Sequence, residues 1–358
     1  MKTLLRLLLK SQHQRNRYGL AQTENGMTLV ELLVGSIMAF LIITPMLSFV
    51  VDMLNTDRRE QVKSNTEQDL QAAVDFIAQD LSQAIYIYDK NPTLNNTPNT
   101  TSTGIPAIRD KLPNPVGGTP ILVFLKQQQM KNSLPINKEA AKTVTPKTCD
   151  DNPGQCNDTY VLSLVAYYQI QEKDKNSIWC QPSGDNCPTR IVRYEIRDGV
   201  RNPDPADFKE PYYKDSDTKL SQRKSPAFDQ KFNPSKPTVG VATSSIEWGQ
   251  PEVLVNYIDH SPGPILTPCT TVLGNPTDPK DTTKKIDGKT LTITDSEIPN
   301  PTNSFYACVD TEKNIARVTI RGNSLRRLQA NNADFKTTSS AFFPTASVQV
   351  KGLGARGN

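Results

Sequence analysis

The residues of this chain that most resemble a catalytic group are Asp259, His260 and Ser261, which follow one another directly. Aspartate, histidine and serine make up the hydrolase triad, in which the histidine takes the proton of a serine nucleophile. A triad is assembled in space, however, and adjacent side chains usually point apart. The sequence also contains no G-x-S-x-G, H-E-x-x-H or P-loop pattern. We therefore interpret His260 as a surface loop residue and expect no enzymatic activity.

Six cysteines follow the N-terminal region: Cys149, Cys156, Cys180, Cys187, Cys269 and Cys308. Each of the first two neighbouring pairs encloses turn-forming residues, so each could close locally without strain. We favour these two local bridges and a longer one between Cys269 and Cys308, although six cysteines allow fifteen connectivities. Disulfides of this number indicate an oxidising compartment.

The sequence gives only weak signals for metal or sugar binding. Zinc is disfavoured because there is no C-x-x-C pair and His260 is the one histidine near the cysteines. The acidic turn that begins at Cys149 lacks the spacing of a calcium loop, so we interpret it as a solvated turn. Trp179 and Trp248 could stack on a sugar, but each more often packs in a core or turn. We expect no metal and no cofactor.

The N-terminal pattern Gly26-Met27-Thr28-Leu29-Val30-Glu31 places a glycine before an apolar stretch and one carboxylate inside it. Leu32–Val51 carries no formal charge and has about the length that a helix needs to cross a membrane. An ordinary secretory signal is disfavoured, because its apolar region precedes the small-residue cleavage site. A plain single-pass anchor accounts for the apolar stretch but gives no reason for Gly26 and Glu31 at this spacing.

This arrangement resembles the prepilin N-terminus of the type IV pilin and pseudopilin family, whose members usually begin with phenylalanine where this chain has Met27. The resemblance implies that prepilin peptidase cuts between Gly26 and Met27 and N-methylates Met27. It also implies that Glu31 neutralises the amino terminus of a neighbouring subunit. The alternative is a glutamate that snorkels to the membrane surface. Pro45 would be a flexible point used in assembly or a tolerated kink.

Charge sets the expected orientation. The predicted leader, residues 1–26, carries five basic residues and one acid, Glu24. Because basic segments stay on the cytoplasmic side, the N-terminus should be cytoplasmic and the bulk of the chain should lie outside the inner membrane. Beyond the leader, basic and acidic residues balance, so we expect no basic surface for nucleic acid.

The rest of the chain divides by composition. Residues 27–51 predict a transmembrane helix half, and residues 52–90 predict an amphipathic half, with apolar residues every three or four positions. Residues 91–120 are rich in Pro, Asn and Thr and predict a linker loop. Residues 121–358 predict a disulfide-stabilised, β-rich extracytoplasmic head.

Short apolar runs, several alternating with polar residues, predict antiparallel strands in the head. We expect strands at Ile121–Lys126, Thr159–Gln171, Arg190–Arg197, Glu252–Ile258, Lys289–Thr294, Phe305–Val309, Ala316–Arg321 and Ala346–Lys351. A polar insertion at 202–237 should be a mobile surface excursion, and residues 352–358 should fray. The expected fold class is α+β, a pilin-like long helix packed on an antiparallel sheet with long loops.

The C-terminal patterns Asn314–Asn323 and Phe342–Val348 are similar to the pseudopilin of cyanobacterial hormogonium polysaccharide secretion. The resemblances imply a non-enzymatic minor pilin or pseudopilin of a type IV pilus-like or type II secretion-like machine, supporting polysaccharide secretion and gliding motility. Its partners would be prepilin peptidase, other pilins, an inner-membrane assembly platform with its ATPase, and the exported polysaccharide. Two alternatives stay open: a pilus-tip adhesin or glycan-binding module, and a membrane-anchored extracytoplasmic enzyme.

Overall fold

The computed structural model describes residues 28–95, 107–184, 186–203, 211–233, 240–278, 281–296 and 301–354. The expected leader, the cleavage position after Gly26, and Met27 lie outside the described residues. The chain divides into two compact units, Met1–Arg58 and Arg59–Asn358, and one long helix contributes to both.

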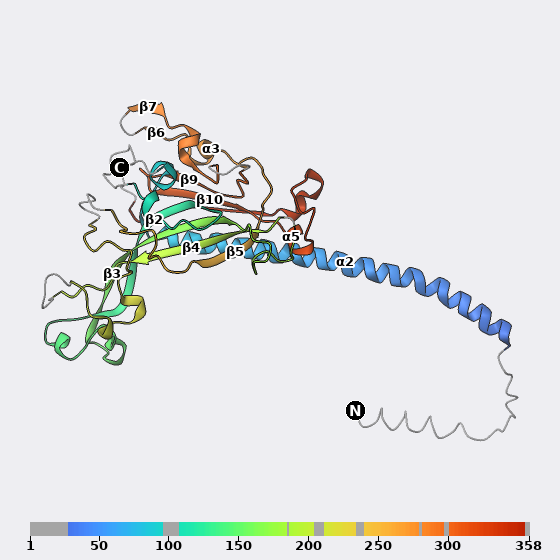
Figure 1. Ribbon diagram of the computed structural model, residues 1–358, viewed down its shortest axis with the longest axis horizontal. Coiled ribbons are helices and arrows are strands. Elements are labelled where there is room, and N and C mark those ends of the chain that lie inside the picture. Colours follow the sequence, from blue (N-terminus) through green and yellow to red (C-terminus); the bar gives the residue numbers. More distant parts are fainter. Residues whose placement is uncertain are drawn as a thin grey trace, which may run out of the picture. The chain divides into compact units, whose positions relative to one another are not determined.

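This helix, α2 (Leu29–Ser82), has 54 residues and continues through Pro45 (Figure 1). The expectation that it reaches residue 90 was wrong. After Ser82 the chain turns, and Ala84–Ile87 forms strand β1, which pairs antiparallel with β2 (Gly118–Pro135). This segment consists mainly of β-branched and aromatic residues, whose spacing fits a helix face but whose shape suits a strand. Pairing with β2 selects the strand.

Five antiparallel strands form the larger sheet: β1, β2, β3 (Cys156–Gln171), β4 (Thr189–Arg197) and β5 (Glu252–Ile258). They lie side by side in sequence order. The longest pair, β2 and β3, runs from Gly118 opposite Ile170 to Pro135 opposite Cys156. The four strands expected in this region are confirmed, and β2 continues past its expected end at Lys126 because β3 offers it backbone partners.

A second sheet contains four antiparallel strands in the order β11-β10-β9-β8. They are β8 (Thr292–Ile293), β9 (Phe305–Asp310), β10 (Ile315–Arg321) and β11 (Thr345–Lys351). The strand expected at Lys289–Thr294 was largely wrong, since Gly288–Leu291 forms helix α4 and only β8 is extended. The Asp287 side chain caps this helix by accepting a hydrogen bond from the Lys289 N–H at 3.3 Å.

Shorter elements lie in the connections. Helices α3 (Cys269–Leu273) and α5 (Leu325–Leu328) and the two-stranded ribbon β6 (Thr277–Asp278) and β7 (Asp281–Lys285) belong to the C-terminal half. A π-helical turn covers Asn91–Asn95. The 3₁₀ turns are Arg109–Lys111, Ala140–Lys142, Cys149–Asp151, Asp215–Asp217, Leu220–Gln222 and Thr337–Phe342.

The main core lies between the C-terminal part of α2 and both sheets. One face of the helix supplies four side chains that are at most 1% exposed: Leu70, Val74, Ile77 and Leu81. They share one cluster with inward residues of both sheets, such as Phe124 on β2 and Val318 on β10. Their spacing of three and four residues is that of a helix with one buried face. The α+β class is confirmed.

A second core covers the other face of the larger sheet. It includes Ile108 and Leu112 from the expected linker, and Phe228 and Phe232 from the expected surface excursion, each at most 4% exposed. Both expectations were therefore wrong for these described residues. Both segments are mostly polar, so their composition did not reveal that a few apolar side chains pack them against the sheet.

Three disulfides stabilise the connections: Cys149–Cys156, Cys180–Cys187 and Cys269–Cys308. They are the two local pairs that the spacing favours and the longer pair formed by the two remaining cysteines. The first closes the tip of the β2–β3 hairpin, and the third ties α3 to β9. The second closes a loop within the connection between β3 and β4. The first and third bridges thus hold connections against the sheets.

The start of the expected C-terminal fray is ordered. The Gly352 N–H donates to the Asn314 carbonyl oxygen at 2.9 Å, and the Gly354 N–H donates to the Ala84 carbonyl oxygen at 3.2 Å. The tail therefore lies on the junction between α2 and β1. Residues 355–358 lie outside the described part of the chain.

Candidate functional site: the N-terminal helix and the buried polar clusters

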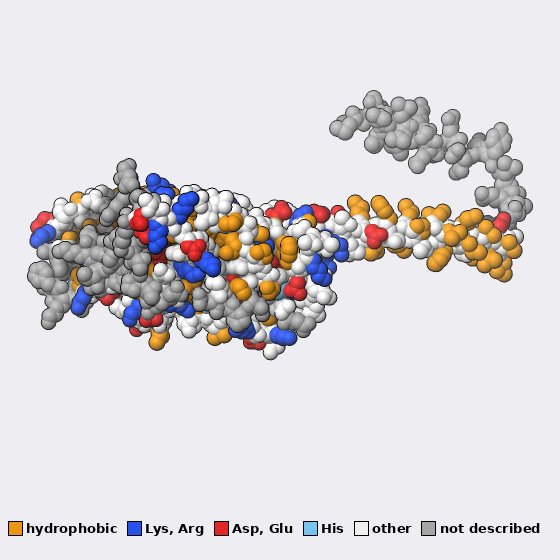
Figure 2. All heavy atoms as spheres, turned by 90° about the horizontal axis from the view of Figure 1, so that it is seen from above, with side chains coloured by type: hydrophobic (Ala, Val, Ile, Leu, Met, Phe, Trp, Pro, Cys, Tyr) orange, Lys and Arg blue, Asp and Glu red, His pale blue; other side chains and the backbone are white. Residues whose placement is uncertain are grey.

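The first half of α2 is an unusually apolar surface. Its large hydrophobic side chains from Leu29 to Leu54 are between 49% and 87% exposed, and Figure 2 shows them along this part of the helix. Its length and composition would allow it to cross a membrane. A surface of this kind needs a non-aqueous environment or a partner.

Glu31 lies in the first turn of this helix and forms a capping box with Thr28. The Thr28 N–H donates to Glu31 Oε2 at 3.0 Å, and the Glu31 N–H donates to Thr28 Oγ1 at 3.3 Å. These two bonds satisfy backbone donors that a helix start leaves unpaired. Sequence reasoning missed this role, although the T-x-x-E spacing before an apolar run is its usual signal.

Pro45 lies within the helix, where it cannot donate the backbone hydrogen bond of a normal helical residue. Next to it, Thr44 Oγ1 donates to the Phe40 carbonyl oxygen at 2.8 Å. The helix continues on both sides of the proline. Pro45 therefore weakens the backbone ladder at one turn of the apolar segment without ending it.

A buried ion cluster joins the second half of α2 to the larger sheet. The Asp80 carboxylate accepts hydrogen bonds from Lys126 Nζ at 2.8 Å, Arg193 Nε at 2.7 Å and the Tyr167 hydroxyl at 2.7 Å. Arg193 also donates to Glu195 at 2.7 Å. Burial alone would raise the pKa of Asp80, but the charges of Arg193 and Lys126 outweigh it and hold this pKa below its usual value. The cluster fixes the helix against β2, β3 and β4.

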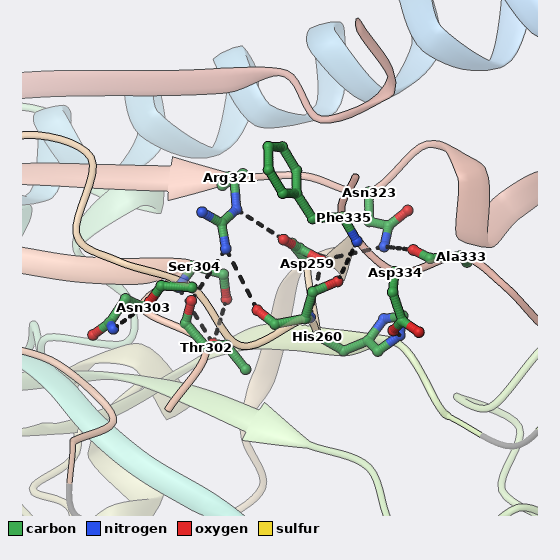
Figure 3. Close-up of polar contacts among 12 residues, drawn as sticks. Asp259, His260, Thr302, Asn303, Ser304, Arg321, Asn323, Ala333, Asp334 and Phe335 are labelled. Atoms are coloured by element: carbon green, nitrogen blue, oxygen red, sulfur yellow. Dashed lines mark hydrogen bonds and ion pairs between the residues drawn. The ribbon is translucent and has the colours of Figure 1, made fainter. Parts of the chain in front are cut away.

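The triad-like residues are buried, contrary to the expectation of a surface loop (Figure 3). His260 is 6% exposed, and its Nε2 lies 3.1 Å from Asp334 Oδ1. Ser261 Oγ accepts a hydrogen bond from the Phe335 N–H at 2.8 Å. His260 was misassigned because the chain that covers it comes from 74 residues further along the sequence.

Asp259 does not orient His260 as a triad aspartate would. Its carboxylate is fully buried and accepts from Arg321 Nε at 2.8 Å and from Asn323 Nδ2 at 3.3 Å. Arg321 also donates to the Thr302 carbonyl oxygen at 3.1 Å. Figure 3 shows these contacts joining the end of β5, the end of β10 and the segment before β11. The cluster thus holds these three connecting segments together. The lack of enzymatic activity stays a prediction.

The two tryptophans differ in environment. Trp248 is 6% exposed and its indole N–H donates to the carbonyl oxygens of Lys111 and Ser244 at 2.8 and 2.9 Å, so it is a core residue. Trp179 is half-buried, with the Arg190 guanidinium 5.2 Å from its ring centroid. Only Trp179 keeps part of its surface open to solvent.

Within the described ranges, no group of three or more histidine, cysteine or acidic side chains is arranged to hold a metal ion. No protein-family model, no curated protein and no solved structure matches this chain.

Proposed function

We propose that this chain is a minor pilin or pseudopilin, a non-enzymatic structural subunit of a type IV pilus-like or type II secretion-like machine. The observation that carries the proposal is the exposed apolar half of α2, with Glu31 as its one charged residue before Asp52. Burying a leucine, isoleucine or phenylalanine side chain contributes about 1.5–3 kcal/mol, so water is an unfavourable environment for this surface. A membrane buries it before assembly, and a bundle of similar helices buries it in a filament.

In this proposal, prepilin peptidase cuts between Gly26 and Met27. The new amino terminus is then on Met27, four residues before Glu31 in the sequence. The Glu31 carboxylate neutralises the amino terminus of a neighbouring subunit, because opposite charges attract far more strongly in a low dielectric than in water. Leu32–Val51 supplies lateral packing, and Pro45 supplies a turn that can deform during assembly.

The protein would reside in the inner membrane with a cytoplasmic N-terminus and an extracytoplasmic head. The three disulfides support an oxidising compartment for the head. Its partners would be other pilins and an inner-membrane assembly platform with its ATPase. The proposal that the machine supports polysaccharide secretion and gliding motility rests on the C-terminal sequence resemblance alone.

Two substitutions separate a filament role of Glu31 from its capping role. Glu31→Gln removes the charge but keeps an acceptor for the Thr28 N–H, because glutamine also serves in a capping box. Thr28→Ala removes the Oγ1 that accepts the Glu31 N–H, and so half of the box, but keeps the carboxylate. We expect Glu31→Gln to reach the membrane in normal amounts and to be lost from sheared surface filaments, whereas Thr28→Ala should be incorporated.

The assay is the ratio of the protein in the filament fraction to that in the membrane fraction, in the native host. If Glu31→Gln is incorporated normally while Thr28→Ala is not, Glu31 acts only as a helix cap. If both variants behave as wild type, the helix is a plain anchor. A membrane-anchored extracytoplasmic enzyme then becomes the better hypothesis.

A further inference from the structure

Strand β11 forms one edge of the second sheet and pairs with β10. The Gly322 N–H donates to the Pro344 carbonyl oxygen at 2.8 Å, and the Gly352 N–H donates to the Asn314 carbonyl oxygen at 2.9 Å. These two bonds mark the two ends of the ladder, and hydrogen-bonded pairs recur in it at every second residue. The residues of β11 that bond to β10 are therefore Ala346, Val348 and Val350. Those whose backbone N–H and C=O groups point away from the sheet are Thr345, Ser347, Gln349 and Lys351.

This outward edge has none of the features that usually block strand pairing. Natural edge strands are protected by a bulge, a proline, several charges or a covering segment. The β10–β11 register has no shift, and β11 contains no proline and a single charge, Lys351, at its last position. Among the residues that the structure describes, no group is hydrogen-bonded to the outward backbone groups. The edge can therefore accept another strand.

The other strands at sheet edges are shorter, covered or irregular. The Gly354 N–H bonds to the Ala84 carbonyl oxygen on β1 at 3.2 Å, and β8 has only two residues. The pairing of β5 with β4 contains register shifts, and Ile258 at the end of β5 bridges Gly322. Strand β11 thus offers the longest regular edge in the described part of the chain.

The apolar layer under the second sheet stops at β11. On β10, Ala316, Val318 and Ile320 are fully buried. The residues opposite them pack on the same core but are only half-buried: Val350, Val348 and Ala346. A further strand with apolar residues at alternate positions would complete their burial.

The strand has the sequence pattern of its own partner. Antiparallel pairing of two copies about Val348 brings all the outward backbone groups of both strands together. Ala346 is then opposite Val350 on the inner face, and Ser347 is opposite Gln349 on the outer face. Lys351 is opposite Thr345, so no like charges face each other. Such a contact is closed by a two-fold axis, as in most homodimers.

Strand β11 runs in the same direction as the second half of α2. Thr345, at its start, is opposite Arg321, and a Cβ on the next residue, Gly322, would lie 2.9 Å from Leu70 Cδ1. The end of β11 leads to Gly354, which bonds to Ala84 beyond the end of the helix. A two-fold axis that makes two β11 strands antiparallel therefore makes the two helix halves antiparallel as well. Subunits anchored in one membrane or one fibre run parallel, so this pairing fits heads that meet from two facing surfaces.

We propose that β11 is a homophilic contact: two heads on facing surfaces join by antiparallel pairing of β11 with β11 of a second copy. The inference goes beyond the proposed function. The strand pairing does not depend on filament assembly, whereas the facing of two surfaces rests on the proposed membrane anchoring. The two parts are therefore tested separately.

Strand pairing is tested by single cysteine substitutions in the full chain in detergent micelles. Two Val348 residues meet on the two-fold axis as a non-hydrogen-bonded pair, with Cα atoms about 4.5 Å apart. This separation suits a disulfide, so Val348→Cys should give a covalent dimer under mild oxidation. Ser347→Cys is the matched control, because Ser347 is opposite Gln349 and two Ser347 residues lie about 7–8 Å apart. Its yield of covalent dimer should be at least tenfold lower.

Ser347→Pro removes an outward N–H that the ladder with β10 does not use. The wild type should sediment as a dimer at about 100 µM, and this variant should be a monomer with an unchanged circular dichroism spectrum. A wild-type monomer at that concentration would overturn the proposal. Equal cross-linking of the two cysteine variants would also overturn it, because it would place the dimer contact elsewhere, for example between the apolar helices.

The facing arrangement is tested with vesicles that carry the full chain with its head outside. Light scattering should show that wild-type vesicles cluster and that Ser347→Pro vesicles stay separate. If the protein dimerises through β11 in micelles but the vesicles do not cluster, the contact between facing surfaces is refuted. None of these outcomes depends on cleavage after Gly26, so a failure here is distinct from a failure of the pilin proposal.

Discussion

Asp80→Asn should lower the free energy of unfolding of this protein by about 3 kcal/mol. The substitution keeps the shape of the side chain and removes one negative charge from the cluster that joins α2 to the larger sheet. Lys126 and Arg193 then keep their positive charges while their side chains are only 6% and 7% exposed. Burying charge without a partner is the main cost, since a buried ion has lost its hydration.

The size of the loss in unfolding free energy depends on the charged groups that remain after the substitution. Breaking a buried ion pair by removing one partner costs about 3–5 kcal/mol. Here Glu195 remains, with one oxygen 2.7 Å from an Arg193 nitrogen and the other 3.7 Å from Lys126 Nζ. We therefore expect the lower end of that range. Asp75→Asn, on the exposed side of the same helix, should cost less than about 0.5 kcal/mol and serves as the control.

The assay is urea unfolding of the full chain in detergent micelles, followed by the fluorescence of its two tryptophans, Trp179 and the buried Trp248. Because the pKa of Asp80 is lowered in the folded state, its contribution is present above the unfolded-state pKa and disappears as pH falls. The gap between wild type and Asp80→Asn should therefore be full above about pH 5 and narrow below about pH 4. A loss under about 1 kcal/mol, or an equal loss in Asp75→Asn, would refute the reasoning.

Three further predictions concern the same folded unit. A Cβ on Gly352 would clash with the Ala84 carbonyl oxygen, so Gly352→Ala should detach the tail and speed hydrogen exchange at the end of β11. Unchanged exchange would contradict this contact. Burial raises the pKa of Asp89 to about 6, so Asp89→Asn should stabilise the protein by about 1–2 kcal/mol at about pH 8 and hardly at about pH 4, as urea unfolding would reveal. Replacing Cys269 and Cys308 together by serine should cost about 4 kcal/mol, against about 2 for either short bridge, because the closed loop is longer; equal losses would argue against the loop-entropy explanation.

Local patterns predicted the elements whose structure depends on local residues. The strand expected at Glu252–Ile258 has these bounds in the structure, because a β-branched run lies between Pro251 and Asp259. The two short disulfides also followed from local spacing, and Cys269–Cys308 followed as the pair that remained. The end of α2 could not be predicted from local residues, because the residues of β1 fit both a helix face and a strand. Their pairing with β2, more than thirty residues away, decides between the two.

Some features of the candidate sites could likewise be predicted from local sequence, and others could not. Glu31 was identified from its spacing to Gly26, and its capping bond to Thr28 was available from the sequence as well. The burial of His260 could not be predicted from the sequence, because it depends on Asp334 and on the hydrogen bonds around Arg321. The ion cluster at Asp80 likewise brings together four elements that are separate in the sequence. No local pattern contains that information.

The central claim is that the chain is processed and assembled as a pilin, and the N-terminus of the native protein tests it most directly. Intact mass and N-terminal sequencing of the membrane-extracted protein should show a chain that starts at N-methylated Met27. A chain that still carries residues 1–26, or that is cut elsewhere, would contradict the account and leave α2 as an ordinary membrane anchor.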